Sequence, residues 1–337
     1  MYIEIMLKVF FLQAIPIATL LSLFIISMKN NTGSLNPSEL KSSKIEATER
    51  NYESIQWETT CQTSRTLVDH TVDSNNSKER VFNRSYTTIL DPFINPNPRI
   101  TNFTKTAMVF DIPIYALASV ADRKIFHAAN IMAQYLDNNE DGTPDNPLVV
   151  EAILKNHGVL ILWKNESDLS QDVFDSLEKE ASAQDLGEYE TIPNWHSNGK
   201  RGPFDASLEE ILHLITHVGY QNAYPTIFGE IPGTKVANAM DRARGGQFLR
   251  VPKKYPNNSW FSYDDKSCDY SCQVTEYIYW ALTSLLGAQE NRKHEIGHEW
   301  KLYTREKVKL SDPHIFKILT DKQYGFPSIL PDGSYRK

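Results

Sequence analysis

Apolar residues recur with a helical period from the end of the first hundred residues onward. Seven of them, three or four residues apart, predict a long helix ending near residue 135: Leu117, Val120, Ala121, Ile125, Ala128, Met132 and Tyr135. Similar patterns predict helices around residues 169–184, 208–220, 234–244, 273–290 and 305–320. The apolar run from Val159 to Trp163 predicts a short buried strand. We therefore expect a mainly α fold of the α+β class, with a few short strands, forming one globular domain over residues 103–337.

The first hundred residues follow a different pattern. The uncharged run from Val9 to Ser27 predicts entry into the secretory pathway, so residues 1–29 are either a cleaved signal peptide or a signal anchor. Residues 30–102 are polar and proline-containing, which predicts a low-order tether. The expected product is secreted, or is a single-pass type II membrane protein with its globular domain outside. Six sequons are then candidate glycosylation sites: Asn30, Asn75, Asn83, Asn102, Asn165 and Asn257.

Composition narrows the class of protein further. The chain has 337 residues, of which 41% are hydrophobic, and this is enough for a large core. Its net charge of -7 supplies no basic stripe, so nucleic acid is not an expected partner. Three cysteines allow one intrachain disulfide, and the short separation favours Cys268 with Cys272 across a non-helical turn. Cys61 could instead pair with either of them, or link two chains.

The most specific chemical pattern follows the first predicted helix. Oxygen-bearing residues alternate in the segment from Asp137 to Asn146, and Gly142 occupies the sixth position, where a tight turn is needed. This spacing resembles the DxDxDGxxD loops of EF-hand relatives, thrombospondin type 3 repeats and integrin propeller blades over nine residues. The resemblance implies a calcium site with a structural role. Its ligands would be Asp137, Asn139, Asp141, Thr143 through its carbonyl, and Asp145.

Two observations leave the assignment of this loop as a calcium site undecided. Leu148 stands at the twelfth position, where an EF-hand has a bidentate glutamate, so Asp145 or Glu151 would have to complete the ligand set. The alternative is a polar turn between helices, because Asp, Asn and Gly are common in any such turn. The next helix would begin with Asn146 as its cap and Pro147 at its first position.

A second candidate metal site lies on the helix predicted over 208–220. His213 and His217 are four residues apart, the spacing by which one helix face chelates zinc, and Glu210 shares that face. The pattern resembles the active-site helix of zincin metallopeptidases. It departs at Leu214, where zincins carry the glutamate that activates water, so Glu210 would have to be the catalytic base. The alternative is that Ser207 and Glu210 form a capping box and bind no metal.

Glu276 is the third predicted zinc ligand. Its helix is apolar nearly all round and should be buried, and a buried carboxylate needs a partner such as a metal held by His213 and His217. The alternative is a carboxylate that simply favours the start of its helix.

A literal HExxH sequence occurs at His294 to His298 and also resembles zincins, over five residues. Its neighbours are charged, and Gly297 disfavours a helix interior, so a solvated helix face explains it better.

The sequence is compatible with three functions. The first is an extracellular, calcium-binding and zinc-dependent hydrolase of the peptidase type, with a peptide or protein substrate that the sequence does not identify. The second is a non-catalytic, calcium-stabilised binding module. The third is a di-iron carboxylate protein, because Glu210-x-x-His213 and Glu295-x-x-His298 have the spacing found in di-iron helix bundles.

Overall fold

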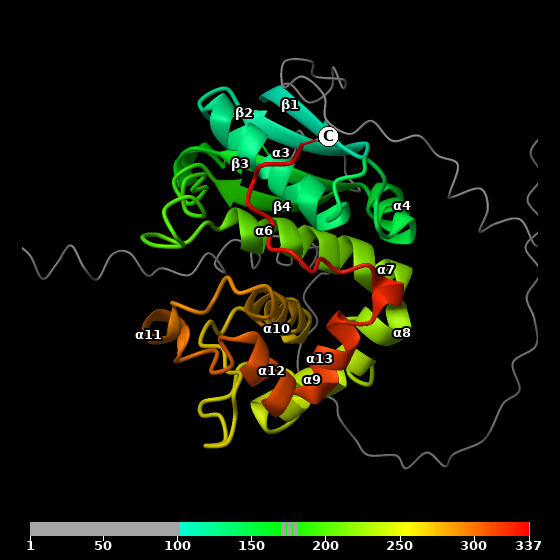
Figure 1. Cartoon of the computed structure of the whole chain (residues 1–337), viewed down its shortest axis with the longest axis vertical. Coiled ribbons are helices and arrows are strands. Elements are labelled where there is room, and N and C mark those ends of the chain that lie inside the picture. The colour runs from blue at the N-terminus through cyan, green and yellow to red at the C-terminus, as the bar shows by residue number, and fades with distance from the viewer. Residues whose placement is uncertain (1–101, 170–172, 174–176, 178–180, 337) are drawn as a thin grey trace, which may run out of the picture.

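The computed structural model describes residues 102–336, apart from residues 170–172, 174–176 and 178–180 (Figure 1). A four-stranded sheet with helices against it forms one half of this region, and a group of helices forms the other (Figure 1). The α+β class predicted from the sequence is confirmed. The N-terminal apolar run, most of the tether, Cys61 and the sequons at Asn30, Asn75 and Asn83 lie outside the described residues.

The sheet has the strand order β1-β2-β3-β4. Strands β1 (Phe103–Val109) and β2 (Ile112–Leu117) form an antiparallel hairpin, whose turn residues Phe110 and Asp111 both have positive φ, as a two-residue turn requires. Strands β3 (Gly158–Trp163) and β4 (Ser182–Gly187) continue the sheet in parallel. Strand β3 is buried along its whole length, which explains why it was the one strand visible as a continuous apolar run.

Of the two helices that flank the predicted calcium loop, the first begins later than the sequence pattern suggests and the second begins where it was predicted. Helix α3 (Asp122–Leu136) is the predicted first helix, but Leu117 belongs to strand β2, because its apolar side chain fits either period. Helix α4 (Pro147–Lys155) starts at the predicted proline. The side chain of Asn146 makes no capping bond and instead donates to the carbonyl oxygen of Tyr324 at 2.8 Å. At the end of the helix predicted over 169–184, residues 182–184 are strand β4 instead.

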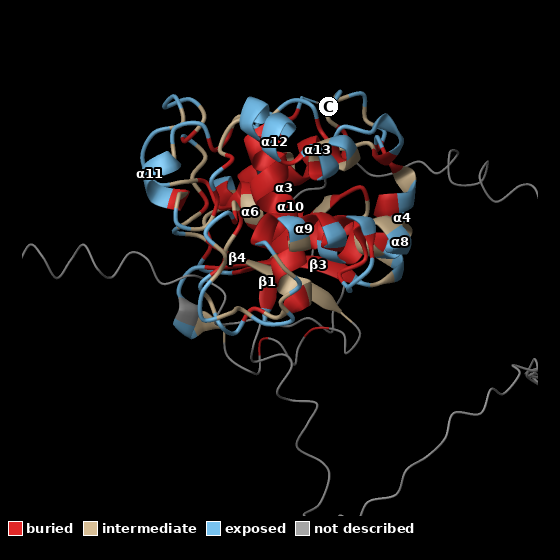
Figure 2. Cartoon of the chain, turned by 90° about the horizontal axis from the view of Figure 1, so that it is seen from below, coloured by how far each residue is buried: buried red, intermediate tan, exposed pale blue. Residues whose placement is uncertain are grey.

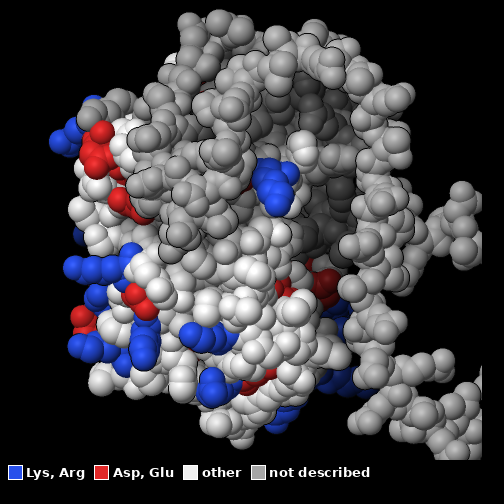
Figure 3. Space-filling model, turned by 90° about the vertical axis from the view of Figure 1, so that its right-hand side faces the viewer, with Lys and Arg blue, Asp and Glu red and all other residues white. Residues whose placement is uncertain are grey.

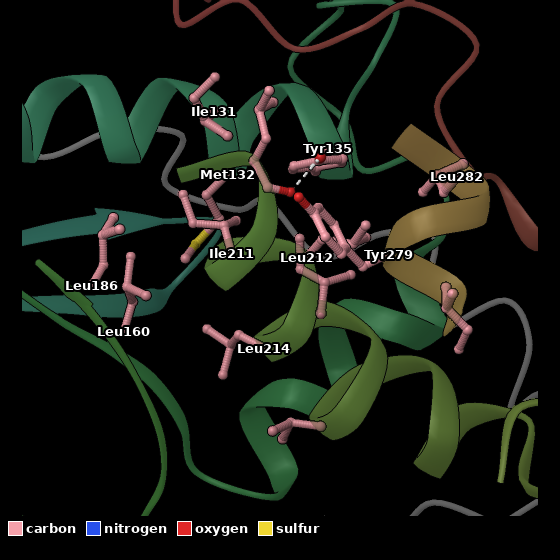
Figure 4. Packing of buried hydrophobic residues seen from close by; sticks show 14 of the residues in the cluster. Ile131, Met132, Tyr135, Leu160, Leu186, Ile211, Leu212, Leu214, Tyr279 and Leu282 are labelled. Atoms are coloured by element: carbon pink, nitrogen blue, oxygen red, sulfur yellow. Dashed lines mark hydrogen bonds between the residues drawn. The ribbon is translucent and has the colours of Figure 1, made fainter. Parts of the chain in front are cut away.

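Helix α6 (Ser207–Leu214) lies between the sheet half and the helical half (Figure 1). It continues directly into η3 (Ile215–Tyr220), a π-helix, and then into two short helices, α7 (Gln221–Ala223) and α8 (Pro225–Phe228). Its apolar residues pack with those of the sheet and of α3 (Figure 4). The hydroxyl of Tyr135 in α3 donates to the carbonyl oxygen of Leu208 at 2.7 Å, which fixes α6 against α3.

The helical half is built around α10 (Tyr270–Leu285), which is buried on nearly all sides, as its apolar sequence predicted (Figure 2). Around it lie α9 (Lys235–Arg244), α11 (Lys293–Ile296), α12 (Arg305–Ser311) and α13 (Pro313–Leu319). The single helix predicted over 305–320 is therefore two helices. Asp312 ends the first and caps the second, where Pro313 takes the first position. Two short 3-10 helices, η2 (Glu166–Asp168) and η4 (Lys322–Tyr324), complete the elements.

The last residues run back from the helical half to the sheet half (Figure 1). The side chain of Asn138 accepts from the backbone nitrogens of Ser328 and Ile329, and the hydroxyl of Tyr335 donates to Asp137 Oδ2 at 2.6 Å. The predicted calcium loop is therefore the point to which the C-terminal segment is attached.

Three further observations concern the predicted outward location. Cys268 and Cys272 form a disulfide, with Cys268 just before α10 and Cys272 in its first turn. Of the candidate glycosylation sites in the described region, Asn102, Asn165 and Asn257 are all exposed. Within that same region no helix combines the length and the apolar character needed to cross a bilayer.

Candidate metal centre

Three potential metal ligands converge where α6 packs against α10. Glu209 and His213 project from α6, four residues apart, and Glu276 projects from α10. One ligand atom from each of these residues lies within 4.8 Å of the other two. Since α6 belongs to the layer next to the sheet and α10 is the centre of the helical half, this group joins the two halves of the molecule.

His213 presents a buried nitrogen that no protein group satisfies. Its Nε2 atom has no hydrogen-bond partner and is 3.7 Å from Glu276 Oε2, too far for a hydrogen bond. Its Nδ1 atom faces the other way, 3.5 Å from Glu210 Oε2. An edge-to-face contact with the ring of Tyr279, at 5.6 Å between centroids, holds the imidazole in place. A buried polar atom without a partner is costly, so this nitrogen is a candidate ligand atom.

The carboxyl of Glu276 is buried beside other acidic side chains. Burial raises the pKa of its carboxyl to about 8, and the nearby Glu209, Glu210 and Glu299 raise it too, against the opposing effect of His213. Its Oε1 atom accepts a hydrogen bond from the hydroxyl of Tyr263 at 3.1 Å. Because a divalent cation favours the ionised form of its carboxylate ligands, a bound metal would lower this raised pKa.

Glu210 lies behind the imidazole. The side chain of Gln184 in strand β4 donates to Glu210 Oε2 at 2.6 Å. Burial, followed by the charges of Glu209, Glu190 and Asp185, raises the pKa of Glu210 well above its usual value. The capping box predicted as an alternative is absent, because the cap of α6 is Ala206 and Ser207 Oγ makes no hydrogen bond. Since Glu210 lies on the Nδ1 side of His213, its position favours orienting this ring over acting as a base on the Nε2 side.

The structure does not place His217 with the other candidate ligands. Its Nδ1 atom is 2.7 Å from Glu230 Oε2, while Glu230 also accepts from Thr275 Oγ1 at 2.8 Å and from the hydroxyl of Ser271. Burial alone would lower the pKa of His217, but its hydrogen bond to Glu230 and the charge of that residue outweigh this and raise the pKa. Glu230 is only 1% exposed, and this buried carboxylate accounts for the position of His217.

Glu209, and not the predicted His217, is the third potential ligand beside His213 and Glu276. The signal that could have identified it is the run Glu209-Glu210-x-x-His213, which has the HExxH spacing with a glutamate in the first histidine position. The pattern contains one histidine, so a motif defined by two histidines does not include it.

The literal HExxH at His294 to His298 forms no comparable centre. His294 is exposed at the short helix α11, and Glu295 Oε1 pairs with Arg292 Nη2 at 2.5 Å. His298 lies instead with Asp264 and Glu299, in a second and more exposed group of potential ligands. Burial and the neighbouring Asp264 raise the pKa of Glu299 to about 8.

The predicted calcium loop folds around its acidic side chains. Asp137 Oδ2 accepts from the backbone nitrogen of Gly142 at 2.7 Å, and Asp141 Oδ1 accepts from that of Thr143 at 2.8 Å. Gly142 has a φ of 87°, which a tight turn at this point requires. Burial raises the pKa of Asp145, and the charges of Asp137 and Asp141 raise it further, although a hydrogen bond from the backbone of Asn138 opposes them. The loop therefore carries mutual repulsion that a cation would relieve.

Comparisons of this chain with protein-family models, with curated proteins and with solved structures found no match. Its function has to be argued from the site itself.

Proposed function

We propose that this protein is a metal-dependent hydrolase whose divalent ion, zinc in the first instance, is held by Glu209, His213 and Glu276. The observation that carries the proposal is the Nε2 atom of His213. It is buried, lacks a partner and is 3.7 Å from a carboxylate oxygen whose pKa is raised. Three protein ligands are the number that catalytic zinc sites have, because a further coordination position would stay free for water or substrate.

The chemistry follows from that open position. A bound divalent ion polarises a substrate carbonyl and lowers the pKa of a coordinated water toward neutrality. Glu210 fits the carboxylate–histidine arrangement found behind many metal ligands, in which the carboxylate accepts from Nδ1 and directs Nε2 to the metal. In this proposal Glu210 orients His213, in place of the catalytic base role expected from the sequence.

Tyr263 supplies a hydrogen-bond donor next to the same centre. Burial, and then the charge of Glu276, raises the pKa of its hydroxyl, so this group stays protonated at neutral pH. The hydroxyl contacts Glu276 Oε1 at 3.1 Å. If it left Glu276, this hydroxyl would be a donor beside a proposed metal ligand that could stabilise an oxyanion developing on the substrate.

The two alternative functions receive less support from the geometry. A di-iron centre would need Glu295 and His298 beside Glu210 and His213, but Glu295 is engaged with Arg292. In a purely non-catalytic module the contact of His213 Nε2 with Glu276 at 3.7 Å would be that nitrogen's only polar contact among the described residues, and the missing hydrogen bond would cost about 1 to 3 kcal/mol.

We also propose that the loop from Asp137 to Asp145 binds calcium in an extracellular setting. The support is the acidic repulsion within the loop, its tight turn at Gly142, and the attachment of the C-terminal segment to Asp137 and Asn138. In this role calcium stabilises the junction between loop and C-terminal segment and takes no part in the reaction.

Hydrolysis is tested by incubating the purified full chain, with zinc and calcium supplied, with a defined mixture of unstructured peptides and reading the products by mass spectrometry. We expect cleavage that 1,10-phenanthroline abolishes and that the Tyr263→Phe variant slows through kcat. The exposed Tyr189→Phe variant serves as a control. Tight zinc binding without hydrolysis of peptides, esters or amides would refute the hydrolase proposal.

A further inference from the structure

A cavity of about 500 Å³ lies between α9 and α13, where η4 follows α13. Helix α9 contributes Lys235, Asn238 and Arg242, which lie on one face of that helix. None of the proposed metal ligands lines this cavity, so it is a separate site. Its volume is in the range of cavities that bind small organic molecules.

The walls of the cavity carry an excess of cationic side chains. Lys235 and Arg242 come from α9 and Lys317 comes from α13, against one acidic residue, Asp321. This excess stands against the net charge of the whole chain, which is -7. In the face shown in Figure 3, lysine and arginine side chains gather over the lower part of the molecule, which contains the helical half.

These charges are not neutralised within the described part of the chain. No described carboxylate is within ion-pairing distance of Lys235, Arg242 or Lys317. Arg242 Nη1 donates only to the carbonyl oxygen of Asn238, at 3.2 Å. The carboxylate of Asp321 accepts from the backbone and side-chain nitrogens of Gln323. The cations of this cavity therefore remain available to a ligand.

Helix electrostatics do not explain the whole arrangement. Arg242 and Lys317 lie in the last turns of their helices, where a cation is favourable. Lys235 is the first residue of α9, next to the cap formed by Thr234, and a cation at that end opposes the helix dipole. Its position beside the cavity thus needs another reason.

Apolar groups also line the cavity. Pro313 and Ile318 contribute aliphatic surface, and the mostly buried Tyr324 lines it as well. A lining that combines apolar and cationic side chains complements a molecule with a hydrophobic body and an anionic group. We propose that this cavity binds a small amphiphilic anion, with its ring or chain on Tyr324 and Ile318 and its acidic group between Lys235, Arg242 and Lys317.

The test uses the full chain and naphthalene-2-sulfonate as the probe, with uncharged naphthalene-2-sulfonamide as its matched analogue, in titration calorimetry. We expect saturable binding of the sulfonate, clearly weaker binding of the sulfonamide, and loss of sulfonate affinity with rising salt, because the contact is electrostatic. The Lys317→Glu variant should bind the sulfonate about tenfold more weakly or worse, equal to about 1.4 kcal/mol.

The exposed Lys254 lies outside the cavity, so Lys254→Glu makes the same charge change and should leave the affinity within about twofold. Melting curves check that each variant folds. If Lys317→Glu does not fold, the Lys235→Gln, Lys317→Gln double variant is measured in its place. Equal affinity for the two probes, an unchanged affinity after charge reversal, or no binding up to the solubility limit would overturn the proposal. These outcomes are independent of zinc binding and of hydrolysis.

Discussion

Replacing Glu276 by glutamine should stabilise the metal-free protein at alkaline pH and destabilise it when zinc is present. The pKa of Glu276 in the folded protein is about 8, against 4.5 for an unperturbed carboxyl. The folded state therefore binds this proton more tightly than the unfolded state does. The corresponding contribution to stability is complete below about pH 4.5 and is lost as the pH rises to about 8. Glutamine stays neutral, so the Glu276→Gln variant escapes this loss.

The size of the effect follows from the same values. At about 1.4 kcal/mol for each pKa unit, the full interval corresponds to a ceiling of about 5 kcal/mol. Part of this is removed because Glu209, Glu210 and Glu299, which raise the pKa, can themselves take up protons. We expect a net gain of roughly 2 to 3 kcal/mol at pH 9 in chelator, which for a domain of this size raises Tm by roughly 5 to 10 °C.

The assay is thermal unfolding of the full chain between pH 5 and pH 9, with chelator and then with excess zinc. At pH 5 the wild-type protein and the variant should unfold at similar temperatures, since the folded wild-type protein keeps the Glu276 proton there and little of its contribution has been lost. With zinc at pH 7.5 the order should reverse, because only the wild-type protein has the third ligand. Glu306→Gln, at an exposed position on α12, is the matched control. A variant that is less stable in chelator at every pH, or a difference independent of pH, would refute the reasoning.

Three further predictions concern the neighbouring sites. The His217→Ala variant should keep its bound zinc in elemental analysis, because His217 contacts Glu230 and not the metal ligands; zinc loss equal to that of His213→Ala would contradict this. Removing calcium with a chelator that leaves zinc in place should lower Tm. If calcium was present at a hundred times its Kd, its removal should lower the free energy of unfolding by about 2.7 kcal/mol. Tyr335→Phe should cost about 1 kcal/mol in urea unfolding, because it removes the bond to Asp137; an unchanged midpoint would show that this bond contributes nothing.

The sequence predicts those parts of the fold where the apolar pattern fits either a helix or a strand, but not both. The buried strand β3, the buried helix α10 and the end of α9 at Arg244 all appear close to where their residues place them. Strands β1, β2 and β4 escape prediction for a physical reason. They are no shorter than β3, but they lack its continuous apolar run and their alternation of buried and exposed positions is weak. Pairing in the sheet, of β1 with β2 and of β2 and β4 with β3, makes them strands. The apolar periodicity over 305–320 hides the break at Asp312 and Pro313, although an Asp before a Pro is typical of a helix start.

The candidate site too is predicted from the sequence only in part. Sequence spacing identifies His213 and Glu276 as a pair, because a buried carboxylate and a histidine on facing helices both need partners. It cannot choose between Glu209 and His217, which lie on either side of His213 along one helix. The π-helical continuation of α6 and the buried Glu230 decide that choice, and neither is encoded in local spacing.

The most direct test of the proposed metal centre is the zinc content of the purified full chain after equilibrium dialysis against buffered zinc. One tightly bound zinc per chain is expected in the wild-type protein and in His217→Ala, and none in the Glu209→Gln, His213→Ala double variant. A wild-type chain that retains no zinc, or a double variant that retains it fully, would contradict the account.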